Sequence, residues 1–189
     1  MPVAIAFLDA SVLYPAPLRD LLLELAVSDL FRAKWSQAVH EEWIGALLRD
    51  RQDLTAERLE RTRRLMDAHV LDAVVTGFEE LIPTVRLPDP DDRHVLAAAV
   101  RAGADLVVTA NLRDFPDAAL APHGLIAEHP DVFLAGLCRR MPVPFLQAAH
   151  RVHARLRNPP VSRREHLAVL RRIGLSATVN EMRKHAATL

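Results

Sequence analysis

Residues 87–115 read LPDPDDRHVLAAAVRAGADLVVTANLRDF, a pattern that predicts one helix followed directly by one strand. The two prolines disfavour helix before about residue 91. Asp92 then falls in the first helical turn, where a negative charge is favourable. The apolar run at 95–100 indicates a mostly buried helix, and Gly103 is placed to end it.

The strand that follows this helix is short and apolar. Residues 104–109 read ADLVVT, a β-branched run typical of the middle of a parallel sheet. Thr109, Asn111 and Asp114 come at its end or directly after it. Ligands bind beyond the carboxyl ends of strands in open α/β sheets. We therefore expect these three side chains at the functional edge of the sheet.

The rest of the chain continues the α/β pattern as far as about residue 140. Strands are expected at 3–9, 31–35, 85–87 and 124–128, and helices at 18–28, 36–49 and about 55–73. Pro142 and Pro144 mark a domain boundary. Beyond it, residues 141–189 are expected to form a small, basic, all-helical extension. Its helices are predicted at about 144–157 and, from the capping-box pair Ser162 and Glu165, as far as Gly174.

Composition sets limits on the class of protein. The 189 residues, 50% of them hydrophobic, can bury a full core in one domain with a modest appendage. The single cysteine, Cys138, excludes an internal disulfide and a multi-cysteine zinc site, and it fits a cytoplasmic location. Asp9 interrupts the first apolar run, so neither a signal peptide nor a membrane span is expected.

Charge is divided unevenly along the chain. Residues 1–138 hold 13 Lys+Arg against 22 Asp+Glu, a net charge of −9, whereas residues 139–189 hold 11 against 2, a net charge of +9. The division predicts an acidic domain that carries the site and a basic segment that could meet a polyanion. A solvated basic face explains the same charge equally well.

Four acids form the candidate site. Asp9 ends the first strand, Glu42 lies on the helix after Ser36, Asp92 opens a helix and Asp114 follows a strand. A parallel sheet brings such positions to one edge. Clustered carboxylates repel one another unless a proton is shared or a cation neutralises them, and oxygen ligands suit Mg²⁺ or Mn²⁺. Such ions can activate water for phosphodiester cleavage.

Each of these residues also has a simpler interpretation. Asp9 could only cap the next helix, which is a common role for an isolated aspartate at such a position. Glu41 and Glu42 lie about 100° apart on the helix, so only one can share a direction with the apolar stripe; Glu42 is the better candidate, and a solvent-facing glutamate is its rival interpretation. His94 lies near the predicted site and could touch a substrate, but a surface position is its simpler interpretation.

These motifs together resemble the PIN-domain ribonucleases, in particular toxins of the VapBC type II toxin–antitoxin family. The resemblance covers about residues 3–138 and is carried by FLDASVLYP, WSQAVHEEW, DPDDRHVLAAAV and VVTANLRDF. It implies a three-layer α/β/α PIN-like nuclease domain at 1–140 with a central parallel sheet. It also implies a catalytic, metal-binding set: Asp9, Glu42, Asp92 and Asp114, with Asn111 as the rival to Asp114, supported by Ser11 and Thr109.

The resemblance further implies a cytoplasmic endoribonuclease that uses Mg²⁺ or Mn²⁺ and cleaves RNA with a metal-activated water. Its partners would be RNA, a cognate antitoxin docked over the site and a second copy in a homodimer, with no membrane association. The basic extension looks like a C-terminal extension carried by one subgroup of these toxins. The alternative from another class is a catalytically silent PIN-like scaffold that binds RNA or a protein partner.

Two other enzyme classes fit the residues less well. A receiver-like phosphoacceptor domain needs a lysine on a late strand, whereas the two lysines here are Lys34 and Lys184. A haloacid-dehalogenase-like phosphatase needs a second aspartate two residues after Asp9, where Ser11 stands.

Overall fold

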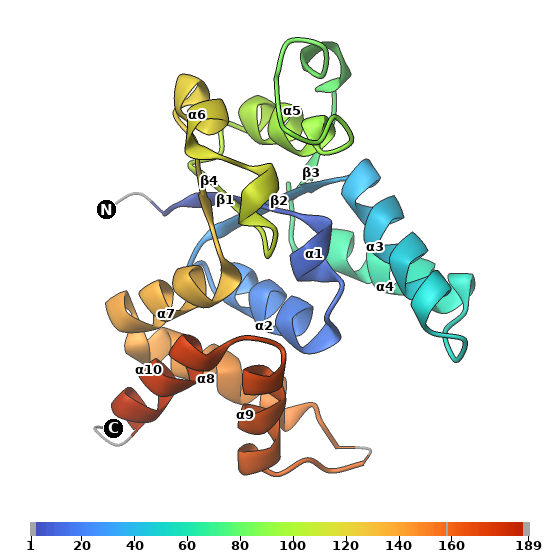
Figure 1. Cartoon of the computed structure of the whole chain (residues 1–189). Coiled ribbons are helices and arrows are strands. Elements are labelled where there is room, and N and C mark those ends of the chain that lie inside the picture. Colours follow the sequence, from blue (N-terminus) through green and yellow to red (C-terminus); the bar gives the residue numbers. More distant parts are fainter. Residues whose placement is uncertain (1–2, 158, 187–189) are drawn as a thin grey trace.

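A parallel five-stranded sheet lies at the centre of the computed structural model, which describes residues 3–157 and 159–186 (Figure 1). The strands lie in the order β3-β2-β1-β4-β5, and all four neighbouring pairs are parallel, as predicted. Their bounds are β1 Ile5–Leu8, β2 Arg32–Ser36, β3 Val74–Val75, β4 Leu106–Val108 and β5 Ile126–Glu128.

Helices cover both faces of this sheet and complete the three-layer arrangement. Figure 1 shows α5 and α6 on one side of the strands, with α2 and α7 on the other. Short 3-10 turns at Glu79–Leu81, Leu112–Asp114 and Ala121–His123 connect some of the elements. The helix bounds are α1 Ala10–Leu13, α2 Ala16–Val27, α3 Gln37–Asp50, α4 Ala56–His69, α5 Arg93–Arg101, α6 Asp117–Leu120 and α7 Pro130–Arg140.

One predicted strand was wrong. Residues 85–87 do not join the sheet, although Val85 and Leu87 are buried as an alternating pattern requires. The edge position beside β2 is taken instead by Val74–Val75, which pairs with Trp35 and Ser36. Val85 and Leu87 are therefore buried by side-chain packing, although residues 85–87 make none of the backbone hydrogen bonds that define a strand pair.

Helix boundaries also differ from the prediction in places. The helix expected from residue 18 begins at Ala16, because Pro17 lies in the first turn, where its missing N–H costs nothing. The helix expected to reach residue 73 ends at His69, and Asp72 has a positive φ of 60°. The short helix α1 was not predicted.

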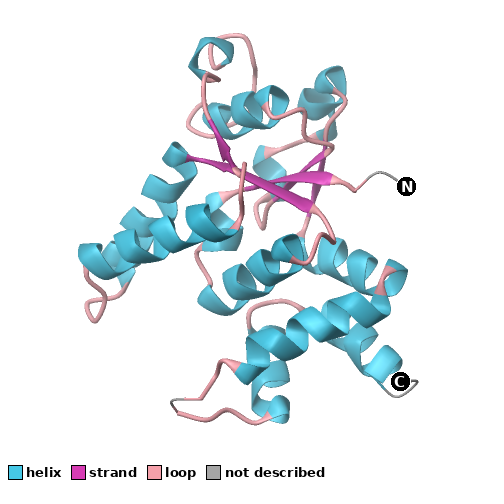
Figure 2. Ribbon diagram, turned by 180° about the vertical axis from the view of Figure 1, so that it is seen from behind, coloured by secondary structure: helices cyan, strands magenta, loops and turns pink. Residues whose placement is uncertain are grey.

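Three further helices form the C-terminal region, α8 Pro142–Ala154, α9 Arg163–Arg172 and α10 Ser176–Ala186. The predicted capping box starts α9, with Ser162 Oγ accepting from Glu165 N at 3.2 Å and Glu165 Oε2 accepting from Ser162 N at 2.8 Å. Gly174, with φ 94°, follows the helix as predicted. Figures 1 and 2 show these helices lying against α2 and α7.

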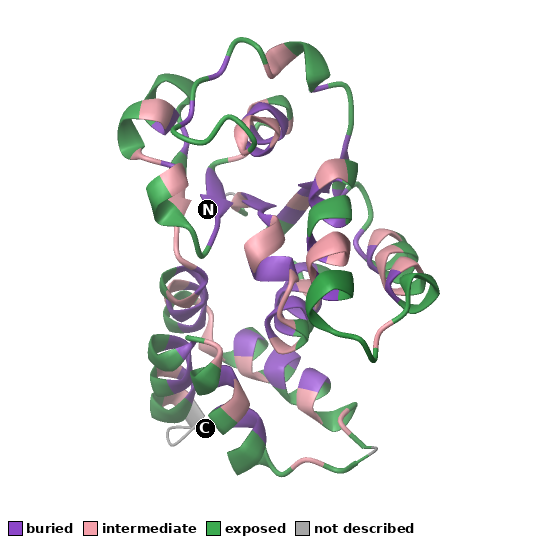
Figure 3. Ribbon diagram, turned by 45° about the vertical axis from the view of Figure 1, so that its right-hand side comes forward, coloured by how far each residue is buried: buried purple, intermediate pink, exposed green. Residues whose placement is uncertain are grey.

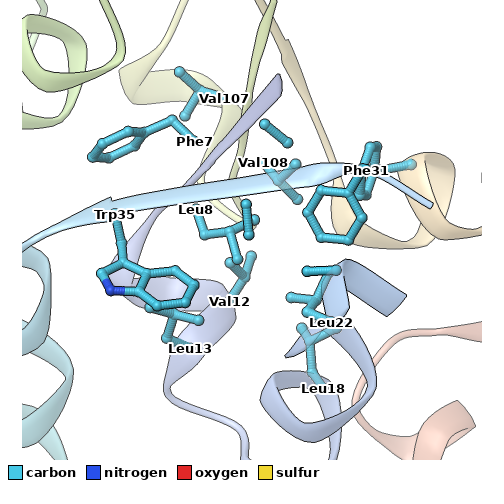
Figure 4. Close-up of a cluster of buried hydrophobic side chains, with 14 of the residues drawn as sticks. Phe7, Leu8, Val12, Leu13, Leu18, Leu22, Phe31, Trp35, Val107 and Val108 are labelled. Atoms are coloured by element: carbon cyan, nitrogen blue, oxygen red, sulfur yellow. The ribbon is translucent and has the colours of Figure 1, made fainter. Parts of the chain in front are cut away.

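The C-terminal helices share one hydrophobic core with the sheet domain. Phe7, Phe31 and Trp35 are buried around the sheet (Figure 4), and Phe31 packs edge-on against Phe133 of α7 at 5.0 Å. The same cluster continues into the extension through apolar side chains of all three helices: Phe145, Ala148, Leu167, Leu170, Val179 and Met182. The extension is therefore an integral layer of the fold and not a loosely tethered tail.

Polar contacts reinforce this junction. Asp131 of α7 accepts hydrogen bonds from the first turn of α10, at 2.8 Å from Ala177 N and 2.7 Å from Thr178 N. Glu24 of α2 pairs with Arg151, at 2.5 Å, and with Arg155. α10 thus receives its N-terminal cap from another helix, and α8 is tied to α2 by a carboxylate that is almost fully buried.

Two predictions from composition can be compared with the structure. Cys138 is a buried free thiol, as expected, and burial raises its pKa to about 11. Within residues 3–157 and 159–186, no helix is both long enough and apolar enough to cross a membrane.

Candidate acidic active site

Asp9 lies at the end of β1, buried between the chain turn into α1 and the end of β4. Its Oδ1 accepts from Ala10 N at 2.7 Å, and its Oδ2 accepts from Ser11 Oγ at 2.6 Å and from Thr109 Oγ1 at 2.8 Å. The carboxylate therefore caps α1, and it is also fixed in one orientation by two hydroxyl groups. The capping interpretation and the site interpretation describe the same side chain.

The supporting hydroxyls connect Asp9 to the loop after β4. Thr109 is fully buried and its Oγ1 accepts from Asn111 N at 2.9 Å, while Ser11 Oγ accepts from Ala110 N at 3.0 Å. Each hydroxyl thus donates to the acid and accepts from the loop. This arrangement places the loop of residues 110–114 beside Asp9, as the position of both segments at strand ends required.

Asn111 and Asp114, the two rivals for the last position of the site, contact each other. The Asn111 side-chain amide donates to Asp114 Oδ2 across the short 3-10 turn. The charge of Asp114 also acts on Asp92, whose pKa it helps to raise. The loop after β4 therefore brings both residues to the edge where the other acids lie.

Asp92 stands at the N-cap position of α5 but makes no side-chain capping bond. Its pKa is raised to about 6, first by partial burial and then by repulsion from Asp9, Asp114, Asp89 and Glu42. The other three predicted acids thus lie close enough to act on Asp92. Among the described residues the carboxylate of Asp92 accepts no hydrogen bond, so its charge lacks the compensation that Asp9 has.

Glu42 is held by a residue whose role the sequence did not indicate. Its Oε1 lies 2.6 Å from His94 Nε2, so that the second turn of α3 contacts the first turn of α5. Both adjacent glutamates are exposed, Glu42 with 42% of its side chain accessible, and Glu41 bonds Gln37 instead of a residue of the site. The sequence placed His94 near the predicted site, because it follows Asp92 by two residues, but gave no signal for its bond to Glu42, which lies 52 residues away.

The electrostatics of His94 follow from its neighbours. Burial lowers its pKa, but the bond to Glu42 and the charges of Glu42, Asp9 and Asp92 outweigh this and raise the pKa above its ordinary value. Its Nδ1 is buried and has no hydrogen-bond partner in the described part of the chain. The imidazole is therefore committed to the acid cluster through Nε2.

The donors suit a hard divalent cation in kind, because they are oxygen atoms with an excess of negative charge. Nowhere in the described residues, however, are three His, Cys, Asp or Glu side chains already arranged to hold one ion. Glu42 is turned toward His94, and Asp114 is bound by Asn111. Each of these contacts uses one carboxylate oxygen, and the second oxygen of Glu42 and of Asp114 makes no hydrogen bond with the described residues, whereas both oxygens of Asp9 are engaged.

Comparisons with known proteins agree with this architecture. Residues 6–113 match the family model described as PIN domain, and residues 130–184 match the one described as VapC50 C-terminal domain. A protein of Mycobacterium tuberculosis (strain ATCC 25618 / H37Rv) named "Putative ribonuclease VapC50" is 50% identical over 62 residues. The match covers 33% of this chain and only 36% of that relative. No solved structure gives a significant match.

Proposed function

The chain belongs to the PIN-domain family, since residues 6–113, more than half of its length, match that model, and from this premise we propose that it is a metal-dependent endoribonuclease. The observation that carries the proposal is the gathering of acids around Asp92, whose pKa is raised to about 6 first by partial burial and then by repulsion from Asp9, Asp114, Asp89 and Glu42. Repelling carboxylates at one sheet edge weaken the fold, and a bound cation removes that disadvantage.

The residues that would hold the ion are Asp9, Glu42 and Asp92, with Asp114 or Asn111 completing the set. When bound, Mg²⁺ or Mn²⁺ supplies charge neutralisation and an acidified water for phosphodiester hydrolysis.

The protein contributes orientation. Ser11 and Thr109 hold the Asp9 carboxylate through two short hydrogen bonds, and His94 holds Glu42 in the second turn of α3. Carboxylates that are already oriented need little reorganisation when they bind a cation, and this preorganisation is the main contribution of the protein to such a site. Asp92 stays without donors and is the side chain with most to gain from a cation.

Family membership extends the proposal to partners. The C-terminal match and the name of the Mycobacterium tuberculosis relative support a toxin of a toxin–antitoxin module, with RNA as substrate. A cognate antitoxin, a homodimer and a cytoplasmic location complete this proposal. They rest on the relationship to the family.

The central test compares Asp92→Asn with Asp91→Asn, a matched change of the neighbouring exposed aspartate. We expect Asp92→Asn to lower RNA cleavage in Mg²⁺ or Mn²⁺ by more than about a hundredfold, because a lost ligand forfeits several kcal/mol in the transition state. Asp91→Asn should retain activity. Cleavage of a fluorophore–quencher RNA is measured, with circular dichroism as the check on folding. Near-normal cleavage by folded Asp92→Asn would overturn the proposal.

A silent scaffold is the second candidate, and the lack of a preformed three-ligand arrangement favours it. Thermal unfolding with and without metal separates the two. If the site binds metal, the free energy of unfolding should rise by about 2.7 kcal/mol at a metal concentration a hundred times the dissociation constant. The free energy of unfolding of the double variant Asp9→Asn, Asp92→Asn should not change on adding metal. An equal shift in that variant would assign the effect to surface binding.

A further inference from the structure

Charge poses a problem for any RNA that approaches this site. Residues 1–138 carry a net charge of −9, so the domain that holds the acids repels a polyanion. Neutralisation of the acid cluster by a cation removes only part of that charge. Attraction for the phosphate backbone must therefore come largely from residues 139–189, whose net charge is +9.

The C-terminal region cannot neutralise itself. Its two carboxylates are already engaged, Glu165 in the capping box with Ser162 and Glu181 with Lys184 at 3.0 Å and Arg139 at 3.7 Å. Arg151 and Arg155 take their countercharge from Glu24 of α2. The basic residues that remain are concentrated on α9.

Four exposed arginines occupy the two ends of α9: Arg163, Arg164, Arg171 and Arg172, hereafter the α9 arginine face. In the middle of the same helix His166, Leu167 and Leu170 are buried, which fixes the orientation of the helix. Figure 3 shows the outward faces of the C-terminal helices as exposed. Arg171 donates to the Asn180 amide oxygen, and the other three arginines make no hydrogen bond or ion pair with the described residues.

Helix stability explains only half of this face. Arg171 and Arg172 lie in the last turn, where positive charge is favourable, but Arg163 and Arg164 lie in the first turn, where it opposes the helix dipole. Each such charge costs roughly 0.3–1 kcal/mol at an exposed helix end. A solvated face formed for stability alone would not place two guanidinium groups there.

We propose that the α9 arginine face binds the phosphate backbone of RNA without regard to sequence. Guanidinium groups suit this role because they are always charged and bond phosphate oxygens in pairs. The inference rests on the proposed function, which supplies RNA as the polyanion that the chain must hold. Binding of this kind is electrostatic, so its strength falls steeply with salt.

Deleting the extension cannot test this inference, because Phe145, Leu167 and Leu170 belong to the shared core and their loss would leave apolar surface exposed. Charge neutralisation avoids the problem. All proteins carry Asp92→Asn to prevent cleavage. The test variant adds Arg163→Gln, Arg164→Gln, Arg171→Gln and Arg172→Gln. The matched control adds the same four-charge change at exposed arginines of α3 and α4: Arg49, Arg58, Arg61 and Arg64.

Affinity for a short single-stranded RNA is measured by fluorescence anisotropy at several salt concentrations. Each lost phosphate contact removes roughly 0.7 from the slope of log affinity against log salt, so the slope for the four-site variant should be flatter by about 3. The control should keep its slope. An unchanged slope in the α9 variant, or an equal loss in the control, would overturn the inference.

The outcome is separable from that of the proposed function. If the unmutated site does not cleave RNA but the α9 variant still loses its salt slope, the nuclease proposal fails and the phosphate-binding face stands. If the chain cleaves RNA and the α9 variant binds with its slope intact, this inference alone fails. Binding of the α9 arginine face to an acidic protein, with no effect on RNA, would also overturn it.

Discussion

His94 Nε2 lies 2.6 Å from Glu42 Oε1, and this contact joins the first turn of α5 to the second turn of α3. The carboxylate can only accept, so the imidazole donates. Because His94 also follows Asp92 by two residues, one side chain sets the separation between two acids of the proposed site. Its Nδ1 is buried without a partner in the described residues, so this donation is its one polar contact.

Replacing His94 should therefore weaken the site without touching an acid. We expect His94→Ala to lower Mn²⁺ affinity by about 10–100-fold, as loss of a residue that orients a ligand usually does. His94→Gln, which keeps a donor, should restore part of it. Calorimetric titration with Mn²⁺ measures the affinity, and kcat and KM for RNA are determined in parallel. Unchanged Mn²⁺ affinity in folded His94→Ala would show that His94 only packs.

Asp92→Asn should stabilise the metal-free protein at neutral pH while abolishing activity. The folded-state pKa of about 6 exceeds the ordinary 3.8, so stability falls as pH rises from about 3.8 to 6 and the loss persists above. Solvent reaches part of the side chain, so we expect a gain of roughly 1–2 kcal/mol at pH 7. Urea unfolding in EDTA tests this, and the gain should vanish near pH 4. A gain that is constant with pH would argue against charge repulsion.

Glu24→Gln should loosen the extension from the sheet domain. Burial raises the pKa of Glu24, but hydrogen bonds from Arg151 and Arg155 lower it more, so the charged form is favoured. Because both arginines are largely exposed, we expect a loss of about 1–3 kcal/mol in unfolding free energy rather than that of a fully buried network. Glu80→Gln, at an exposed site, is the control. Equal urea midpoints for the two variants would contradict the importance of this junction.

His40 predicts a separate acid sensitivity. It is fully buried, with Nε2 3.0 Å from Asp67 Oδ1 and Nδ1 accepting from Trp43 Nε1 at 2.9 Å. Burial lowers its pKa, against the opposing effect of Asp67. As pH falls, His40 is therefore protonated at a higher pH in the unfolded chain than in the folded protein. The free energy of unfolding decreases as pH falls below about 6.5. His40→Gln should be less stable than wild type by about 1–3 kcal/mol at pH 8. Urea unfolding should show a smaller stability difference between His40→Gln and wild type at pH 5 than at pH 8. A stability difference that does not depend on pH would contradict a role for His40 protonation.

Local sequence signals account for much of the fold. Apolar runs marked four of the five strands, and Ser162 with Glu165 marked the start of α9. Val74–Val75 is too short to give a periodic signal, whereas 85–87 alternates and yet stays outside the sheet. Strand pairing depends on which segment reaches the edge of β2, and that is a tertiary property.

The candidate site also combines features that local sequence predicts with features that only the tertiary structure reveals. Asp9, Asp92 and Asp114 could be selected because each follows a strand or opens a helix, and the structure places them where they repel one another. Their roles as ligands remain a prediction, as does a domain boundary at residue 140. The bond between Glu42 and His94 could not be foreseen, because nothing in either segment encodes a partner 52 residues away.

The cap that Asp131 provides to α10 joins two helices that the ribosome makes at different times. The ribosome makes α7 before α10, so the newly made chain carries a carboxylate without its amide donors and an apolar face without its cover. The contacts that cap α10 and cover α7 can therefore form only after residues 176–186 have been made.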